Sequence, residues 1–157
     1  MKRHLLALPL AAGLLLLGTL GCSKKEEEAE PIGTGSYKLD GRTINCQAQA
    51  YLSTGTNAGG SPYDYLEVQL TTTPQPASGP EVLHLYLGRP SVYPNSTYWL
   101  TSLELRNSAN PSGMPFGRDN STLSTGSNNR FSGTFAARNI YYTTTLISDG
   151  VFTNAHP

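Results

Sequence analysis

The residues with the clearest chemical potential in this 157-residue chain are its two cysteines, Cys22 and Cys46. A positively charged start is followed by an apolar run, residues 5–20, and Cys22 comes just after this run. The charged segment 23–28 follows Cys22. An apolar stretch that stops at a small residue and a cysteine is typical of a secretion signal cleaved before a lipid-modified thiol. We therefore expect residues 1–21 to be removed and the mature chain to begin at Cys22.

Cys46 has a different setting. It belongs to an alternating row of apolar residues whose other members are Ile44, Ala48, Ala50 and Leu52. With Cys22 taken by lipid, Cys46 has no partner for an intramolecular disulfide, and no cationic neighbour favours its thiolate. We expect it to be a small buried hydrophobe.

The segment around Cys22 resembles the lipobox of bacterial lipoproteins, a Leu-rich stretch that ends in Gly or Ala before the modified cysteine. Here residues 19–22 are Thr-Leu-Gly-Cys. The resemblance implies a diacylglycerol on the sulfur of Cys22 and an acyl chain on its amine, and no other cofactor is expected. Two or more such chains anchor a protein stably in its membrane.

The residues after Cys22 resemble a localisation signal. Ser23 and the charged segment 23–28 are similar to the signals that place such lipoproteins in the outer membrane and, in Bacteroidota, on its outer face. We expect a lipid-anchored protein exposed at the outer membrane surface, with the periplasmic face as the alternative. Its first partner is then outer-membrane lipid, held through Cys22.

The chain divides into three parts. Residues 22–35 are small or charged and show no apolar periodicity, which predicts a flexible tether behind the lipidated cysteine. Such a coil of about 14 residues has a root-mean-square span near 20 Å. Residues 36–157 are long enough to fold as one domain with its own core.

Alternation with period two dominates this domain. It predicts strands at residues 36–39, 42–52, 63–72, 81–87, 97–106, 131–138, 141–148 and 151–154. The first two flank Asp40-Gly41 and the last two flank Asp149-Gly150, dipeptides that favour hairpin turns. In the fifth segment the pattern places Trp99 on the inward face with Leu103. Residues 107–129 show no pattern, so they form a functional or mobile connection or conceal a short strand around 121–124.

No stretch of the domain has a sustained helical period. We therefore predict an all-β fold, a single antiparallel β-sandwich of about 7–8 strands, with an open β-barrel as the alternative. Residues 131–135 (FSGTF), 147–152 (ISDGVF) and 39–42 (LDGR) resemble the ends of small Bacteroidota lipoproteins with a β-sandwich domain of unknown function. That resemblance brings no catalytic residues with it.

Charge excludes one class of partner. From residue 32 onward, seven basic residues face seven acidic ones, without a basic cluster. Nucleic-acid binding depends on phosphate neutralisation by Lys and Arg, so we expect no nucleic-acid partner.

We find no catalytic or metal-binding constellation in the sequence. His84 is expected to be a packed or hydrogen-bonded strand residue, and Gly-x-Ser-x-Gly is absent. Asp64 with Glu67, or Glu67 with Glu104, could pair as in glycoside hydrolases, but acids on strands usually keep a face soluble. Histidines, cysteines and carboxylates lack the short spacing of metal ligands. We predict a non-enzymatic protein without a metal.

Aromatic composition is the one surface feature with functional content. Nine Tyr and one Trp stand among many Asn, Ser and Thr residues, a composition suited to binding glycans or proteins through rigid amphipathic rings. The candidate binding residues are Tyr63, Tyr65, Tyr93, Tyr141 and Tyr142. The other interpretation is that tyrosine is simply a favoured strand residue. A hydrolase of an extracellular substrate and a structural accessory subunit of an outer-membrane complex are the alternative functions.

The lipid anchor is directly testable. Labelled palmitate should enter the wild-type chain and not Cys22→Ser, because only Cys22 follows the apolar run. Labelling is followed by immunoprecipitation and autoradiography. Equal incorporation into both chains would contradict the anchor.

Overall fold

The computed structural model describes residues 32–157, so the predicted signal and Cys22 lie outside the described residues. The chain forms eight strands and one short 3₁₀ turn: β1 (Gly33–Leu39), β2 (Arg42–Thr56), β3 (Pro62–Thr72), β4 (Val82–Pro90), β5 (Trp99–Arg106), β6 (Met114–Thr125), η1 (Ser127–Asn129), β7 (Phe131–Asn139) and β8 (Leu146–Ala155). β1 begins three residues before the expected start of the domain at residue 36. In this part of the chain, no helix has the length and apolar character needed to cross a bilayer.

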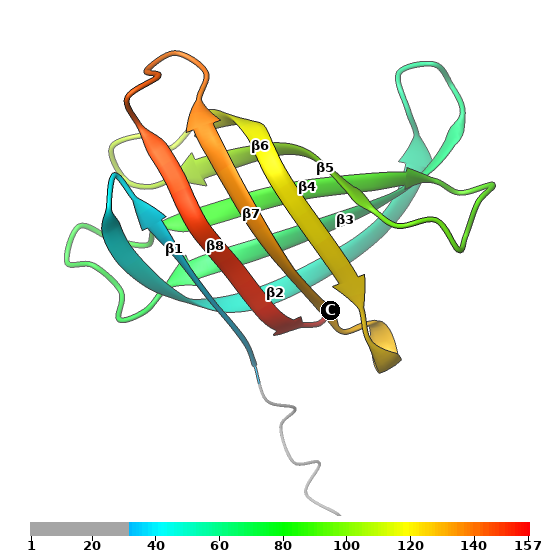
Figure 1. Cartoon of the computed structure of the whole chain (residues 1–157), viewed down its shortest axis with the longest axis horizontal. Coiled ribbons are helices and arrows are strands. Elements are labelled where there is room, and N and C mark those ends of the chain that lie inside the picture. Colours follow the sequence, from blue (N-terminus) through cyan, green and yellow to red (C-terminus); the bar gives the residue numbers. More distant parts are fainter. Residues whose placement is uncertain (1–31) are drawn as a thin grey trace, which may run out of the picture.

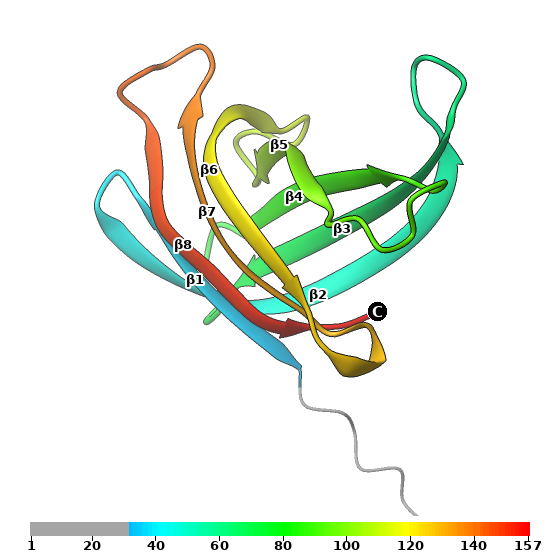
Figure 2. The same ribbon diagram turned by 45° about the vertical axis from the view of Figure 1, so that its right-hand side comes forward.

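The strands form one closed antiparallel barrel. Each pairs with the next along the chain, and β8 pairs with β1, so the order around the barrel follows the sequence (Figure 1, Figure 2). The all-β prediction and the strand number are therefore confirmed. The two-layer sandwich is not what forms, because pairing of β1 with β8 closes a single sheet on itself. Alternating inward and outward residues are common to both architectures, which is why the sequence pattern did not separate them.

A glycine makes the closure possible. Gly33 on β1 lies between β2 and β8, and a Cβ at this position would lie 2.7 Å from the carbonyl oxygens of both Ala48 and Asn154. Only a residue without a side chain allows β1 to approach both neighbours at this point.

Inward-facing side chains pack the barrel interior. Aromatic rings cross it from β1 to β8, with centroids 6.4 Å apart for Tyr37 and Phe135 and 6.5 Å apart for Phe135 and Phe152. Leucines and valine fill the wall opposite, at Leu66, Val68, Leu70, Leu83, Leu85 and Leu87. Each fully buried side chain of this size contributes about 1.5–3 kcal/mol.

β6 corrects the expectation for residues 107–129. It is a 12-residue strand that pairs with β7 along most of its length, from Phe116 opposite Asn139 to Thr125 opposite Phe131. Phe116 is its one fully buried residue, and the others are mainly small and polar. The alternation that would reveal a strand is therefore missing, and pairing with β7 determines the structure instead.

β8 corrects the second predicted hairpin. The strand continues through Asp149-Gly150, and the turn lies earlier, between β7 and β8. Asp149 has φ of 50°, and the register with β1 shifts nearby, between Ser36 and Lys38, as at a β-bulge. The dipeptide therefore bends a strand rather than reversing the chain.

The seam between β5 and β6 is the weakest junction of the barrel. Only three residue pairs join these strands, Leu103–Leu105 of β5 opposite Met114–Phe116 of β6. Beyond these pairs the two strands diverge, as Figure 2 shows. Nη1 of Arg118 spans the opening with a hydrogen bond of 2.8 Å to the carbonyl oxygen of Leu100.

Replacing Gly150 tests the packing of the bulge. A Cβ at this position would lie 2.5 Å from the Phe135 ring, so Gly150→Ala should lower the free energy of unfolding, by about 1–3 kcal/mol as in other overpacked cores. Urea unfolding followed by far-ultraviolet circular dichroism measures the loss.

The matched control is Gly59→Ala in the exposed β2–β3 connection, where a Cβ would meet only the Asn57 side chain, at 3.4 Å. It should leave the free energy of unfolding nearly unchanged. Equal stability of the two variants would show that the bulge is not tightly packed.

Candidate functional site on the outer face of β2–β5

The structure separates the five candidate tyrosines. Tyr63 and Tyr65 lie together at the start of β3, and Tyr93 lies in the β4–β5 connection, 66% exposed. All three belong to a lobe that projects from the barrel, formed by the β2–β3 hairpin and the β4–β5 connection (Figure 1). Tyr141 and Tyr142 are exposed in the β7–β8 connection at the opposite end of the barrel. They therefore belong to a different surface.

A strip of three aromatic side chains, Tyr63, Tyr65 and Trp99, crosses from β3 to β5. The Tyr63 ring centroid is 5.1 Å from that of Tyr65 and 5.9 Å from that of Trp99, which it meets edge-on. Tyr63 covers the bare backbone of Gly88 on the strand between them. Trp99 remains 42% exposed, so its ring is both fixed and accessible.

Trp99 was predicted to face inward, and this prediction was wrong. The register between β4 and β5 shifts between Tyr86 and Leu87, where Thr101 is the extra residue. The Thr101 hydroxyl donates a hydrogen bond of 2.7 Å to the carbonyl oxygen of Tyr86. This bulge reverses the alternation, so Leu100 and Leu103 both point inward and Trp99 points outward.

Next to the aromatic strip lies a hydrogen-bonded network centred on Glu67. Its Oε1 accepts hydrogen bonds from Nδ1 of His84 at 2.6 Å and from Nε2 of Gln69 at 2.9 Å. His84 is 8% exposed and stacks on the ring of Tyr86, with centroids 6.0 Å apart. The expectation of a hydrogen-bonded strand histidine is confirmed.

Burial raises the pKa of Tyr86 above its ordinary value, and the nearby carboxylates of Glu67 and Glu104 add to the effect. Its phenol therefore stays protonated at neutral pH and keeps a hydroxyl group for hydrogen bonding. Farther out on β2, Tyr51 stands opposite Glu67 and is 41% exposed.

The structure places the two acid pairs considered from the sequence in different ways. Asp64 and Glu67 are three residues apart on one strand, so they lie on opposite faces of the sheet. Glu67 and Glu104 share the outer face, but each is engaged: Glu67 by His84, and Glu104 by Arg106 at 3.1 Å. The arrangement presents them as fixed hydrogen-bond acceptors.

Two shallow grooves lie at the margins of this wall. One, of about 240 Å³, is lined by Ile32, Gln47, Ala48, Gln49, Thr71 and His156. The other, of about 350 Å³, lies over β4 and β5 and is lined by His84 and Arg106 together with residues of the adjoining connections. The outer face of β2–β5 thus combines aromatic rings, amides and carboxylates between two hollows.

The lobe is stiffened from its inner side. Arg89 contacts Asp64 at 3.1 Å, lies 4.4 Å from the centroid of the Tyr98 ring, and donates to the carbonyl oxygens of Pro94 and Ser96 at 2.6 and 3.2 Å. A hydrogen bond from Ser91 and the contact with Arg89 hold the pKa of Asp64 below its usual value. The connection that carries Tyr93 is therefore fixed by charged hydrogen bonds.

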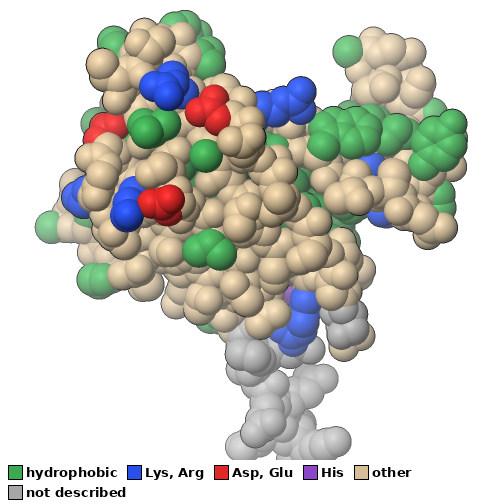
Figure 3. Space-filling model, viewed as in Figure 1, with side chains coloured by type: hydrophobic (Ala, Val, Ile, Leu, Met, Phe, Trp, Pro, Cys, Tyr) green, Lys and Arg blue, Asp and Glu red, His purple; other side chains and the backbone are tan. Residues whose placement is uncertain are grey.

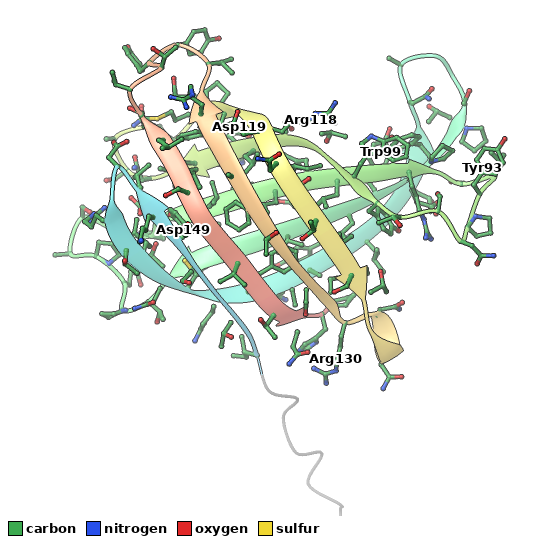
Figure 4. The ribbon with its side chains drawn as sticks, in the orientation of Figure 1. Tyr93, Trp99, Arg118, Asp119, Arg130 and Asp149 are labelled. Atoms are coloured by element: carbon green, nitrogen blue, oxygen red, sulfur yellow. The ribbon has the colours of Figure 1, made fainter. Side chains whose placement is uncertain are left out.

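The projecting lobe and the wall over β6–β8 differ in surface character. Figure 4 shows Trp99 and Tyr93 on the same projecting lobe, and Figure 3 shows hydrophobic side chains gathered there. The wall nearest the viewer, over β6–β8, is mainly uncharged and polar (Figure 3).

Within residues 32–157, no three His, Cys, Asp or Glu side chains gather as metal ligands. No protein-family model, curated protein or solved structure matches the chain.

Cys46 provides a test of the packed interior. It is 3% exposed, which confirms the expected buried hydrophobe, and burial raises the pKa of its thiol to about 11. Since a raised pKa keeps the thiol protonated below that pH, a thiol reagent should not label native Cys22→Ser protein at pH 8. After unfolding in guanidinium, one equivalent should react. Rapid labelling of the native protein would contradict the burial of Cys46.

Proposed function

We propose that this protein is a lipid-anchored, non-enzymatic binding protein of the outer membrane surface, and that the outer face of β2–β5 binds a glycan. The observation that supports this most is the aromatic strip, in which exposed Trp99 is fixed by Tyr63 and adjoins a polar wall. Sugar rings have C–H faces that pack on aromatic rings and hydroxyls at their edges that need hydrogen bonds. The strip and the network around Glu67 supply these two kinds of contact side by side.

Pre-organisation favours binding at this surface. Tyr63 is buried and in ring contact with both other members of the strip, so Trp99 loses little side-chain freedom when a ligand covers it. His84 and Gln69 hold the carboxylate of Glu67 in one orientation. Ligand hydroxyls would therefore meet acceptors that are already in place.

The polarity of the wall favours a glycan over a protein partner. The cores of protein interfaces are poor in charged residues and rich in apolar contact. Here Glu67 follows Tyr65 on the outer face of β3, and Gln69 and Glu104 lie one row farther along, so polar and charged groups border the strip on this side. A narrow apolar strip with a polar border matches the alternating faces and edges of sugar rings.

Trp99 is the only tryptophan in the chain and can report binding directly. The detergent-solubilised full chain is titrated with soluble gluco-, xylo- and manno-oligosaccharides, and tryptophan fluorescence is recorded. A ligand that covers Trp99 should change the emission saturably. Calorimetry with Trp99→Ala should show binding weakened about tenfold or more, equivalent to about 1.4 kcal/mol.

Tyr141→Ala is the control, because Tyr141 is an exposed aromatic residue at the other end of the barrel. Its affinity should match the wild type. Equal weakening by Tyr141→Ala and Trp99→Ala, or no binding of any glycan, would overturn the proposal.

A further inference from the structure

We infer that the outer face of β2–β5 selects neutral, hydroxyl-rich glycan chains over glycans that carry carboxylate or sulfate groups. The inference rests on the proposed function, because it names the ligand class for the same wall. It is carried by the distribution of charge and of hydrogen-bonding groups over the four strands.

The outward row of β2 carries no charge. From Thr43 to Ser53 every second residue has a hydroxyl or an amide: Thr43, Asn45, Gln47, Gln49, Tyr51 and Ser53. Amides both donate and accept hydrogen bonds, as sugar hydroxyls do. Gln47 and Gln49 also line the groove with Thr71, so three uncharged polar side chains border one hollow.

The charged groups of this wall favour a ligand that donates hydrogen bonds. Glu67 and Glu104 are its two acids, and Arg106 is its one permanently charged cation. Carboxylates form strong, charge-assisted hydrogen bonds with hydroxyl donors. Counting the two acids and Arg106, the formal charge of the wall is one unit negative, which repels an anionic chain.

An anionic ligand would need a cation that is not already engaged. Arg106 contacts Glu104 through two hydrogen bonds, of 3.2 and 3.1 Å. Arg89 of β4 points to the inner side of the lobe and contacts Asp64. A carboxylate or sulfate on the wall would therefore have to displace Glu104 from Arg106.

The dimensions of the wall suit a chain rather than a single sugar. Strands are spaced about 4.8 Å apart, so the rows from β2 to β5 extend about 14 Å across the strands. In register, Gln49, Gln69, His84 and Glu104 lie side by side along one such row. This row lies four residues along β3 from Tyr65, so a linear glycan that covers Trp99 and runs along the strands reaches it after passing Glu67.

The test compares matched polymers. The full chain in detergent is run by affinity electrophoresis through gels that contain mixed-linkage glucan or galactomannan, both neutral, or polygalacturonate or chondroitin sulfate, both anionic. We expect retardation by at least one neutral polymer and at least tenfold weaker binding to both anionic ones. Raising the salt concentration should narrow the difference, because it screens the repulsion.

Single carboxylate-to-amide variants test the role of the wall's charges. Glu104→Gln frees Arg106 and removes one negative charge, so binding to polygalacturonate should strengthen several-fold. Asp119→Asn removes an exposed carboxylate from β6, outside the wall, and should change binding to neither kind of polymer. Circular dichroism of each variant confirms that it is folded.

The outcomes distinguish failure of the neutral selectivity from failure of glycan binding itself. Tighter binding to anionic polymers that depends on Trp99 would overturn the neutral selectivity and leave glycan binding in place. Absence of binding to all four polymers and to the oligosaccharides would overturn the proposed function itself. Equal changes in polygalacturonate binding by Glu104→Gln and Asp119→Asn would refute the role of the wall's charges.

Discussion

Pairing of β1 with β8 is the constraint on which the rest of the structure depends. It turns an open meander into a closed sheet, so each strand has one set of side chains inside and the other outside. Tyr37, Phe135 and Phe152 then fill the interior. Because the interior is occupied by packing, the outer wall is the surface on which function can be built.

The sequence predicted the strands wherever one face is apolar and the other polar. β2, β3 and β4 follow that rule through Cys46, Val68 and Leu85, and Asp40-Gly41 forms the expected turn between β1 and β2. The rule fails where a strand buries little, as in β6. It also fails at Asp149-Gly150, because a dipeptide that favours positive φ serves a bulge as well as a turn.

Only part of the candidate site could be predicted from the sequence, for a related reason. Tyr63 and Tyr65 are adjacent on one strand face, so their proximity follows from spacing alone. The contact of Glu67 with His84 depends on the register of β3 with β4, which the sequence does not specify. Trp99 was assigned to the wrong face because the extra residue at Thr101 is invisible to a period-two count.

The few pairs at the β5–β6 seam have a consequence for motion. β2 is joined to β1 by seven residue pairs, while β5 is joined to β6 by three, so β2–β5 is a leaf with one firm edge and one loose edge. Sub-global opening in proteins follows such cooperative units and begins where hydrogen bonds are fewest. Opening at the β5–β6 seam would leave the ladders within β2–β5 intact. The wall that bears Trp99 and Glu67 would then keep its internal arrangement while the barrel opens locally.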